Sequence, residues 1–185
     1  MSYRIPKLNP AQIQRVIQRV ADYIGRQRQT YRPSAVGLDP IKLAAMRPFF
    51  PASTLEAARL IVLAANWVSN PPFYGELTRM GFEAGSLPNF ALMAAITFVD
   101  TVVSHGPFTN SVLFHELVHV VQYQKLGLIE FAAKYVRGFL DGGSYEAIPL
   151  EMNAYELRHG LRQHQRILFW LRMRFKSGLM RAGSN

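Results

Sequence analysis

The chain has 185 residues, of which 49% are hydrophobic and 12% aromatic, and its formal net charge is +9. This composition excludes a disordered chain, and we expect one domain, residues 1–185, with a substantial core. Because the sequence contains no cysteine, disulfides and thiolate ligands are excluded, and a metal site has to use histidine, aspartate or glutamate.

Two helices are predicted near the N-terminus from the same start signal. Asn-Pro at 9–10 and Asp-Pro at 39–40 each combine a good cap with a proline in the first turn. Apolar residues follow the first pair at helical spacing, and we expect that helix to end at Gly25. We expect the second helix to end at Pro48, because proline cannot continue it.

Residues 49–103 contain weaker signals. Ser53 and Glu56 form a capping-box pattern, which predicts a short helix. Residues 59–64 fit a helix or a strand equally well. Residues 70–90 are rich in turn residues and are predicted to run over the surface. Residues 95–103 are rich in β-formers and predict a strand.

The C-terminal half is predicted to be helical. The stretch "SVLFHELVHVVQ" should form a helix capped by Thr109 or Asn110 and ended by Gly127. A second amphipathic helix should follow up to Gly142, and Pro149 should begin a long one. The predicted fold class is therefore α+β and mainly helical, with a small sheet.

The motif HELVH places two histidines where they can share one metal ion. His115 and His119 are four residues apart and lie on the same face of a helix. Zinc binds histidine nitrogen readily, and a catalytic zinc site keeps one position open for water. Glu116 would lie beside such an ion and could take a proton from the water. The motif is the signature of zinc metallopeptidases, although two hydrogen-bonded core histidines would also fit.

A third ligand has to come from elsewhere in the chain. Downstream, Glu151 lies in the first turn of the helix that Pro149 begins, next to apolar residues, and we favour it. Glu146 is the next candidate, and His105 lies in the loop before the HELVH helix. A His-His-Glu set without cysteine fits Zn²⁺ best among the divalent ions.

The combination of HELVH with a glutamate on a later helix resembles the gluzincins, the thermolysin-like zinc peptidases. The small size resembles the minigluzincins, and "FHELVHVVQYQKLG" resembles the HExxH domain of bacterial proteins associated with extracellular contractile injection systems. The resemblance covers residues 95–156. It implies a minimal zincin-like catalytic core there. Outside the resemblance, we expect a helical support region at 1–94 and a basic C-terminal helix at 157–185.

The resemblance also implies roles for individual residues. His115, His119 and Glu151 would bind zinc, and Glu116 would be the general acid/base. The strand ending near Val103 would be the sheet edge that pairs with an extended peptide substrate.

At one position the chain departs from the gluzincin pattern. Thermolysin-like enzymes carry an aspartate four residues after the glutamate ligand, where it supports a zinc histidine, and this chain has Tyr155 there. Support could come instead from Asp100 or Asp141. Tyr145, Tyr155 and His159 are candidates for the side chain that stabilises the oxyanion.

The positive charge is concentrated at the C-terminal end. Residues 157–185 contain seven lysines and arginines and no acidic residue. A solvated helix face is the favoured interpretation, and an anionic partner or membrane surface would also fit. No specific nucleic acid is predicted. The first residues carry no secretory signal, so a cytoplasmic location is expected, with non-classical export as a further route.

The sequence therefore predicts a zinc-dependent metallopeptidase that hydrolyses peptide bonds with a zinc-activated water and Glu116. One alternative is a catalytically weak or inactive module in which zinc is a structural staple, and whose basic C-terminal helix holds an acidic partner or a membrane surface. Another is a basic membrane-surface or nucleic-acid protein without a metal.

Overall fold

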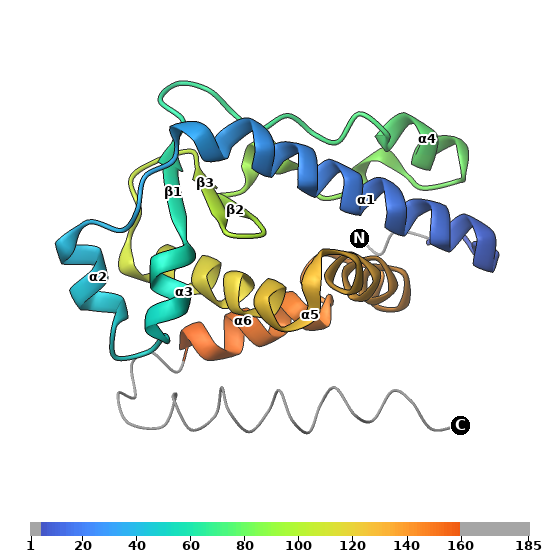
Figure 1. The fold of residues 1–185 in the computed structure, drawn as a ribbon. Coiled ribbons are helices and arrows are strands. Elements are labelled where there is room, and N and C mark those ends of the chain that lie inside the picture. Colours follow the sequence, from blue (N-terminus) through green and yellow to red (C-terminus); the bar gives the residue numbers. More distant parts are fainter. Residues whose placement is uncertain (1–4, 160–185) are drawn as a thin grey trace, which may run out of the picture.

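The computed structural model describes residues 5–159, and within them a small sheet is surrounded by helices (Figure 1). The fold is α+β and mainly helical, as predicted. Predictions about residues 160–185, including most of the basic helix, lie outside the described residues. The elements are α1 (Pro10–Tyr31), η1 (Arg32–Ser34), α2 (Pro40–Met46), α3 (Ala52–Ala57), β1 (Arg59–Val62), α4 (Tyr74–Arg79), η2 (Ala84–Ser86), η3 (Phe90–Leu92), β2 (Ala95–Phe98), β3 (Thr101–Ser104), α5 (Asn110–Gly142) and α6 (Pro149–His159).

The sheet has the order β1-β3-β2, with β3 parallel to β1 and antiparallel to β2. All four residues of β3 are buried. Successive side chains of a strand point to opposite faces, and accordingly Val102 and Val103 belong to two different apolar clusters. The Val103 cluster includes residues of α1 and the second half of α5, whereas the Val102 cluster includes α3 and the first half of α5. The sheet therefore separates two cores.

The predicted strand over 95–103 is wrong in one respect, because the segment is a hairpin. The chain turns at Val99 and Asp100, and Val99 has a φ of 64°, which is unusual for a β-branched residue. The Asp100 carboxylate accepts two hydrogen bonds from Arg28, each 2.8 Å, and pairs with Arg32 at 2.8 Å. Since both arginines belong to the end of α1 and the residues directly after it, tertiary contacts hold a turn that has no glycine to mark it.

Two helix limits also differ from the predictions. The first helix continues six residues beyond Gly25, to Tyr31. Tyr31 stacks on Phe98 of β2, with ring centroids 6.1 Å apart, so packing on the sheet extends the helix. Helix α3 begins at Ala52, directly after Pro51, and has no side-chain cap, so the predicted capping box with Ser53 does not form. Residues 59–62, for which the sequence fitted a helix or a strand, form the strand β1.

The HELVH segment lies in α5, which Figure 1 shows running below the sheet with α6 packed against it. Thr109 caps the helix, and Gly127 breaks it with φ 73° and ψ 169°, as predicted for that position. Close packing joins α5 and α6: a Cβ atom added to Gly138 would lie 2.5 Å from Cδ of Pro149. The small residue thus allows the start of α6, and with it Glu151, to approach α5.

The segment at 70–90 is more than a surface excursion, because it contains α4 and buries Leu77 and Phe82 in the core. Among the described helices, none has both the length and the apolar character needed to cross a membrane.

Candidate metal centre

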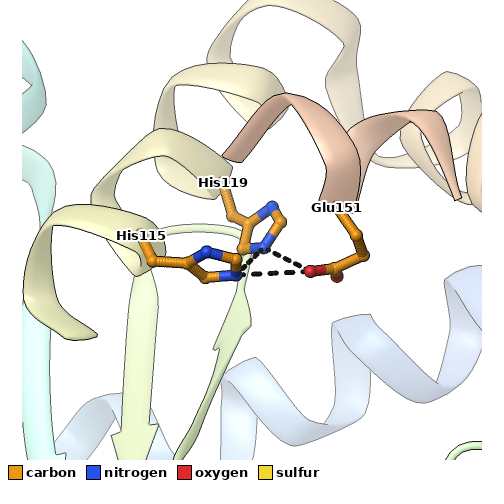
Figure 2. Close-up of side chains that lie close together, drawn as sticks. All are labelled: His115, His119 and Glu151. Carbon is orange, nitrogen blue, oxygen red and sulfur yellow. Dashed lines mark hydrogen bonds and ion pairs between the residues drawn. The ribbon is translucent and has the colours of Figure 1, made fainter. Parts of the chain in front are cut away.

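Three side chains from two helices converge in the interior. His115 and His119 lie one turn apart on the first half of α5, and Glu151 lies in the first turn of α6. Figure 2 shows the two imidazoles and the carboxylate pointing at one another. The Nε2 atoms of the histidines are 3.1 Å apart, and Oε2 of Glu151 lies 3.3 Å from Nε2 of His115 and 3.4 Å from Nε2 of His119.

These distances fit a shared metal ion. Ligand atoms bound at about 2.0–2.1 Å to a tetrahedral zinc ion lie roughly 3.3 Å from one another. The three separations, 3.1, 3.3 and 3.4 Å, match that spacing without any movement. All three residues are buried, with Glu151 only 3% exposed. The three residues therefore have the atom types, the spacing and the enclosure of one face of a tetrahedral site.

Gln122 sets the orientation of one ligand candidate, His119. Its Oε1 atom accepts a hydrogen bond of 2.8 Å from Nδ1 of His119. Its Nε2 atom donates to the carbonyl of Leu150 at 3.0 Å and to Oδ1 of Asn153 at 3.2 Å. Because Nδ1 of His119 carries the proton, Nε2 of the neutral ring has the free lone pair that a metal ligand needs. Gln122 therefore links His119 of α5 to the helix that carries Glu151.

The charges at the centre favour a cation. Among the described residues, Nδ1 of His115 and Oε2 of Glu151 are buried without a hydrogen-bond partner, and a buried carboxylate needs a compensating charge. Burial by itself lowers the pKa of His119, but the adjacent Glu151 carboxylate outweighs this effect and raises that pKa to about 9. For Glu151, the charges of His119 and His115 outweigh burial and lower the pKa of the carboxyl. The three side chains thus stabilise positive charge between them.

Glu116 lies beside this group and is held by the neighbouring strand. The hydroxyl of Thr97, on β2, donates a hydrogen bond of 2.7 Å to Oε2 of Glu116. The Glu116 side chain is 5% exposed and forms part of the wall of both hollows that meet at the centre. Its carboxylate therefore has a fixed position next to the three ligand candidates.

Two hollows of different character meet here. On the side of His119 and Glu151, a cavity of about 130 Å³ runs into the core between α1, α4 and the second half of α5. Its wall is mostly apolar and rich in aromatic rings, among them Phe131, Tyr135 and Phe139. On the side of His115, a more polar cleft of about 510 Å³ lies open. A molecule at the centre could thus occupy both an apolar cavity and a polar cleft.

The other candidates for the third ligand lie elsewhere. Nδ1 of His105 is 2.7 Å from the carbonyl of Met93, and its Nε2 atom accepts a hydrogen bond from the backbone of Val68, so His105 ties loops together. Glu146 is exposed on the wall of the cleft and is not part of the group of three.

Neither predicted supporting carboxylate reaches the histidines. Asp100 is engaged by Arg28 and Arg32, and Asp141 is exposed. At the position of the expected aspartate, the ring of Tyr155 packs on the His115 imidazole, with centroids 4.7 Å apart and planes inclined by 54°. An aromatic contact thus stands at His115 where a hydrogen bond was expected.

The three oxyanion candidates can now be placed. Tyr145 contributes to the wall of both hollows, and its hydroxyl interacts with Glu151. Burial, and after it the charge of Glu151, raises the pKa of Tyr145 far above the ordinary value, so the hydroxyl stays protonated. Tyr155 covers His115, and His159 is exposed at the end of α6.

Sequence reasoning missed two partners of the centre and misplaced the sheet edge. Thr97 gave no signal, because a threonine in a strand is ordinary, and the sequence did not indicate that Gln122 contacts α6. The strand that ends at Ser104, β3, is the central one, so the expectation that it forms the edge is wrong. The edge beside Glu116 is β2.

Comparison with protein-family models, with curated proteins and with solved structures finds no match for this chain.

Proposed function

We propose that this protein is a zinc-dependent peptidase of gluzincin type. The observation that carries the proposal is the spacing of the Nε2 atoms of His115 and His119 and the Oε2 atom of Glu151, which corresponds to one face of a tetrahedral zinc site. When bound, zinc would supply Lewis acidity, which polarises a carbonyl and lowers the pKa of a water.

Glu116 would be the general acid/base, and its held carboxylate beside the three ligand candidates supports this role. It would accept a proton from the attacking water and later donate a proton to the leaving amine. The hydrogen bond from Thr97 occupies Oε2, so it restrains the carboxylate while Oε1 remains for proton transfer. Of the three candidates we favour Tyr145 as the donor to a developing oxyanion, because it lines both hollows and its hydroxyl stays protonated.

The two hollows suggest how a peptide would bind. The edge of β2 presents backbone groups beside Glu116, and an extended peptide could pair with it as a further strand. The aromatic cavity next to His119 would then take a large apolar side chain, whose burial contributes on the order of 1.5–3 kcal/mol. We therefore expect substrates with such a residue near the cleaved bond.

A zinc-stapled binding module is the less favoured alternative. A structural zinc site is closed by four protein ligands and needs no general base. Here the described residues supply three ligand candidates, an adjacent carboxylate and an open cleft. These features support catalysis rather than a staple.

The test combines metal content with peptide cleavage on the purified full chain. We expect about one zinc per chain in the wild type, in Glu116→Gln and in Glu146→Ala, and loss of zinc in Glu151→Ala. Only the wild type and Glu146→Ala should cleave a library of blocked peptides. The proposal would be overturned if the wild type did not take up zinc. It would also be overturned if Glu116→Gln cleaved the peptides as well as the wild type does.

A further inference from the structure

Helix α6 presents a second functional residue to the open cleft. Glu151, Tyr155 and Arg158 are separated by four and three residues, so they lie along one face of the helix. Glu151 belongs to the candidate metal centre, whereas Tyr155 and Arg158 line the cleft together with His115 and Glu116. The arginine thus shares the hollow in which the reacting groups would meet.

The position of Arg158 is fixed relative to the centre by a stack of rings. The ring of Tyr155 packs on His115 at a centroid distance of 4.7 Å. The guanidinium carbon of Arg158 lies 4.7 Å from the centroid of the same Tyr155 ring. A guanidinium on an aromatic face keeps its in-plane N–H groups free to bind a carboxylate with two hydrogen bonds. One aromatic ring therefore separates a positioned anion-binding group from a ligand histidine.

Among the residues that the structure describes, Arg158 belongs to no ion pair. Three other arginines are paired, Arg28 and Arg32 with Asp100 and Arg19 with Glu76, whereas most of the remaining described arginines, like Arg158, form no ion pair. Within residues 5–159 no carboxylate forms an ion pair with Arg158, and residues 160–185 contain no aspartate or glutamate. Glu116 and Glu146, which line the same cleft, would repel an anion from their own parts of the wall. An anion entering the cleft is therefore attracted to Arg158.

We propose that Arg158 is a specificity residue that binds a carboxylate of the peptide substrate. The inference rests on the proposed peptidase function and adds a substrate class to it. The carboxylate has two sources in a peptide, the C-terminus and an acidic side chain, and both present the same planar pair of oxygens. Tyr155 acts as a positioning residue, because its ring holds the guanidinium at the cleft wall.

The test measures peptide binding by calorimetry to the zinc-loaded full chain carrying Glu116→Gln, which should bind without cleaving. Each acetylated peptide contains one large apolar residue and is made as the free acid, as the amide, and as the amide with one internal glutamate. We expect at least one of the two carboxylate forms to bind about tenfold or more tightly than the plain amide. The form that does so identifies the source.

Variants of Arg158 and Tyr155 distinguish carboxylate binding by these residues from a purely structural role. Arg158→Gln should remove the preference for the carboxylate and leave the zinc content and the binding of the plain amide unchanged. Tyr155→Leu should weaken the preference for the carboxylate. Tyr155→Phe retains the aromatic ring and should therefore retain that preference. The control is Arg137→Gln, which removes an exposed arginine of α5 that lines neither hollow.

The outcomes distinguish this inference from the proposed function. If the wild type cleaves the peptides and all three forms bind Glu116→Gln equally, the role of Arg158 is overturned and the peptidase stands. The role is also overturned if Arg158→Gln keeps the preference. If the zinc-loaded wild type neither binds nor cleaves any form, both proposals are overturned.

Discussion

Nδ1 of His119 donates a hydrogen bond of 2.8 Å to Oε1 of Gln122, and Gln122 in turn donates to the carbonyl of Leu150, the residue before Glu151. Gln122 is fully buried, at 0% exposure. One side chain thus sets the tautomer of a ligand candidate and fixes the helix that bears another. The opposite histidine, His115, has ring packing from Tyr155 in place of such a bond. The two histidines are therefore supported in different ways.

Replacing Gln122 with leucine should weaken zinc binding about 10- to 100-fold, because the His119 proton loses its acceptor and the orientation of the ring is no longer fixed. Competition with a chromophoric chelator measures the affinity. The control is Gln124→Leu, two residues further along the same helix, whose exposed side chain accepts a hydrogen bond from Thr54 and contacts no ligand candidate. Equal zinc affinity in the two variants would contradict the role of Gln122.

Replacing Thr97 with valine should lower kcat about tenfold or more, because a buried hydrogen bond to the Glu116 carboxylate is lost. Zinc content should not change, since Thr97 contacts none of the three ligand candidates. Thr97→Ser keeps the hydroxyl and should retain most of the activity. Steady-state kinetics on one cleaved peptide tests this, and a Thr97→Val enzyme with normal kcat would show that the strand does not position Glu116.

Replacing Val136 with phenylalanine should fill part of the aromatic cavity, because Val136 is buried in its wall. Cleavage of peptides with a large apolar side chain should fall, whereas cleavage of peptides with alanine at that position should be retained. Overpacking will also cost about 1–3 kcal/mol of stability, so thermal unfolding is followed in parallel. Ile129→Phe adds a ring at a half-exposed position of the same helix and is the matched control.

Replacing Gly138 with alanine should destabilise the protein by about 1–3 kcal/mol, because the new methyl group would lie 2.5 Å from Cδ of Pro149. Gly75→Ala is the comparison: Gly75 is also helical, and no atom lies within 4 Å of its added Cβ. That change should be neutral or stabilising by up to about 1 kcal/mol. Urea unfolding measures the free energy of unfolding of both variants. Equal values would exclude close packing as the reason why residue 138 is a glycine.

Asp100 should make stability depend on pH in the acid range. Burial by itself raises the pKa of Asp100, but the hydrogen bond and charge of Arg28, together with Arg32, outweigh it and lower the pKa. A lowered pKa means that the stabilisation is complete above the unfolded value of about 3.9 and is lost as the pH falls through the native value.

The measurement for Asp100 is urea unfolding of the wild type and Asp100→Asn between pH 7 and pH 3. The variant should be less stable by about 1–2 kcal/mol at neutral pH, since it loses the charge that both arginines bind. The difference should narrow towards pH 3. Asp22→Asn, at an exposed position of α1, should show no such trend.

The amino-acid sequence by itself determined what depends on local spacing. Histidines four residues apart share a helix face wherever a helix forms, and the flanking apolar residues bury that face. Thr109 as the cap and Gly127 as the break follow from backbone preferences that need no distant partner. Pro149 predicts the first turn of a helix from its backbone preference alone, and this places Glu151 on that helix.

Only the tertiary structure decided the relations between distant segments. It turned 95–104 into a hairpin because Arg28 and Arg32 reach Asp100, and it made β3 the central strand, so that β2 became the edge beside Glu116. It also brought Thr97 and Glu116 together, and Tyr155 onto His115. These contacts join residues 19 to 72 positions apart, and their energies depend on packing that no local pattern of the sequence encodes.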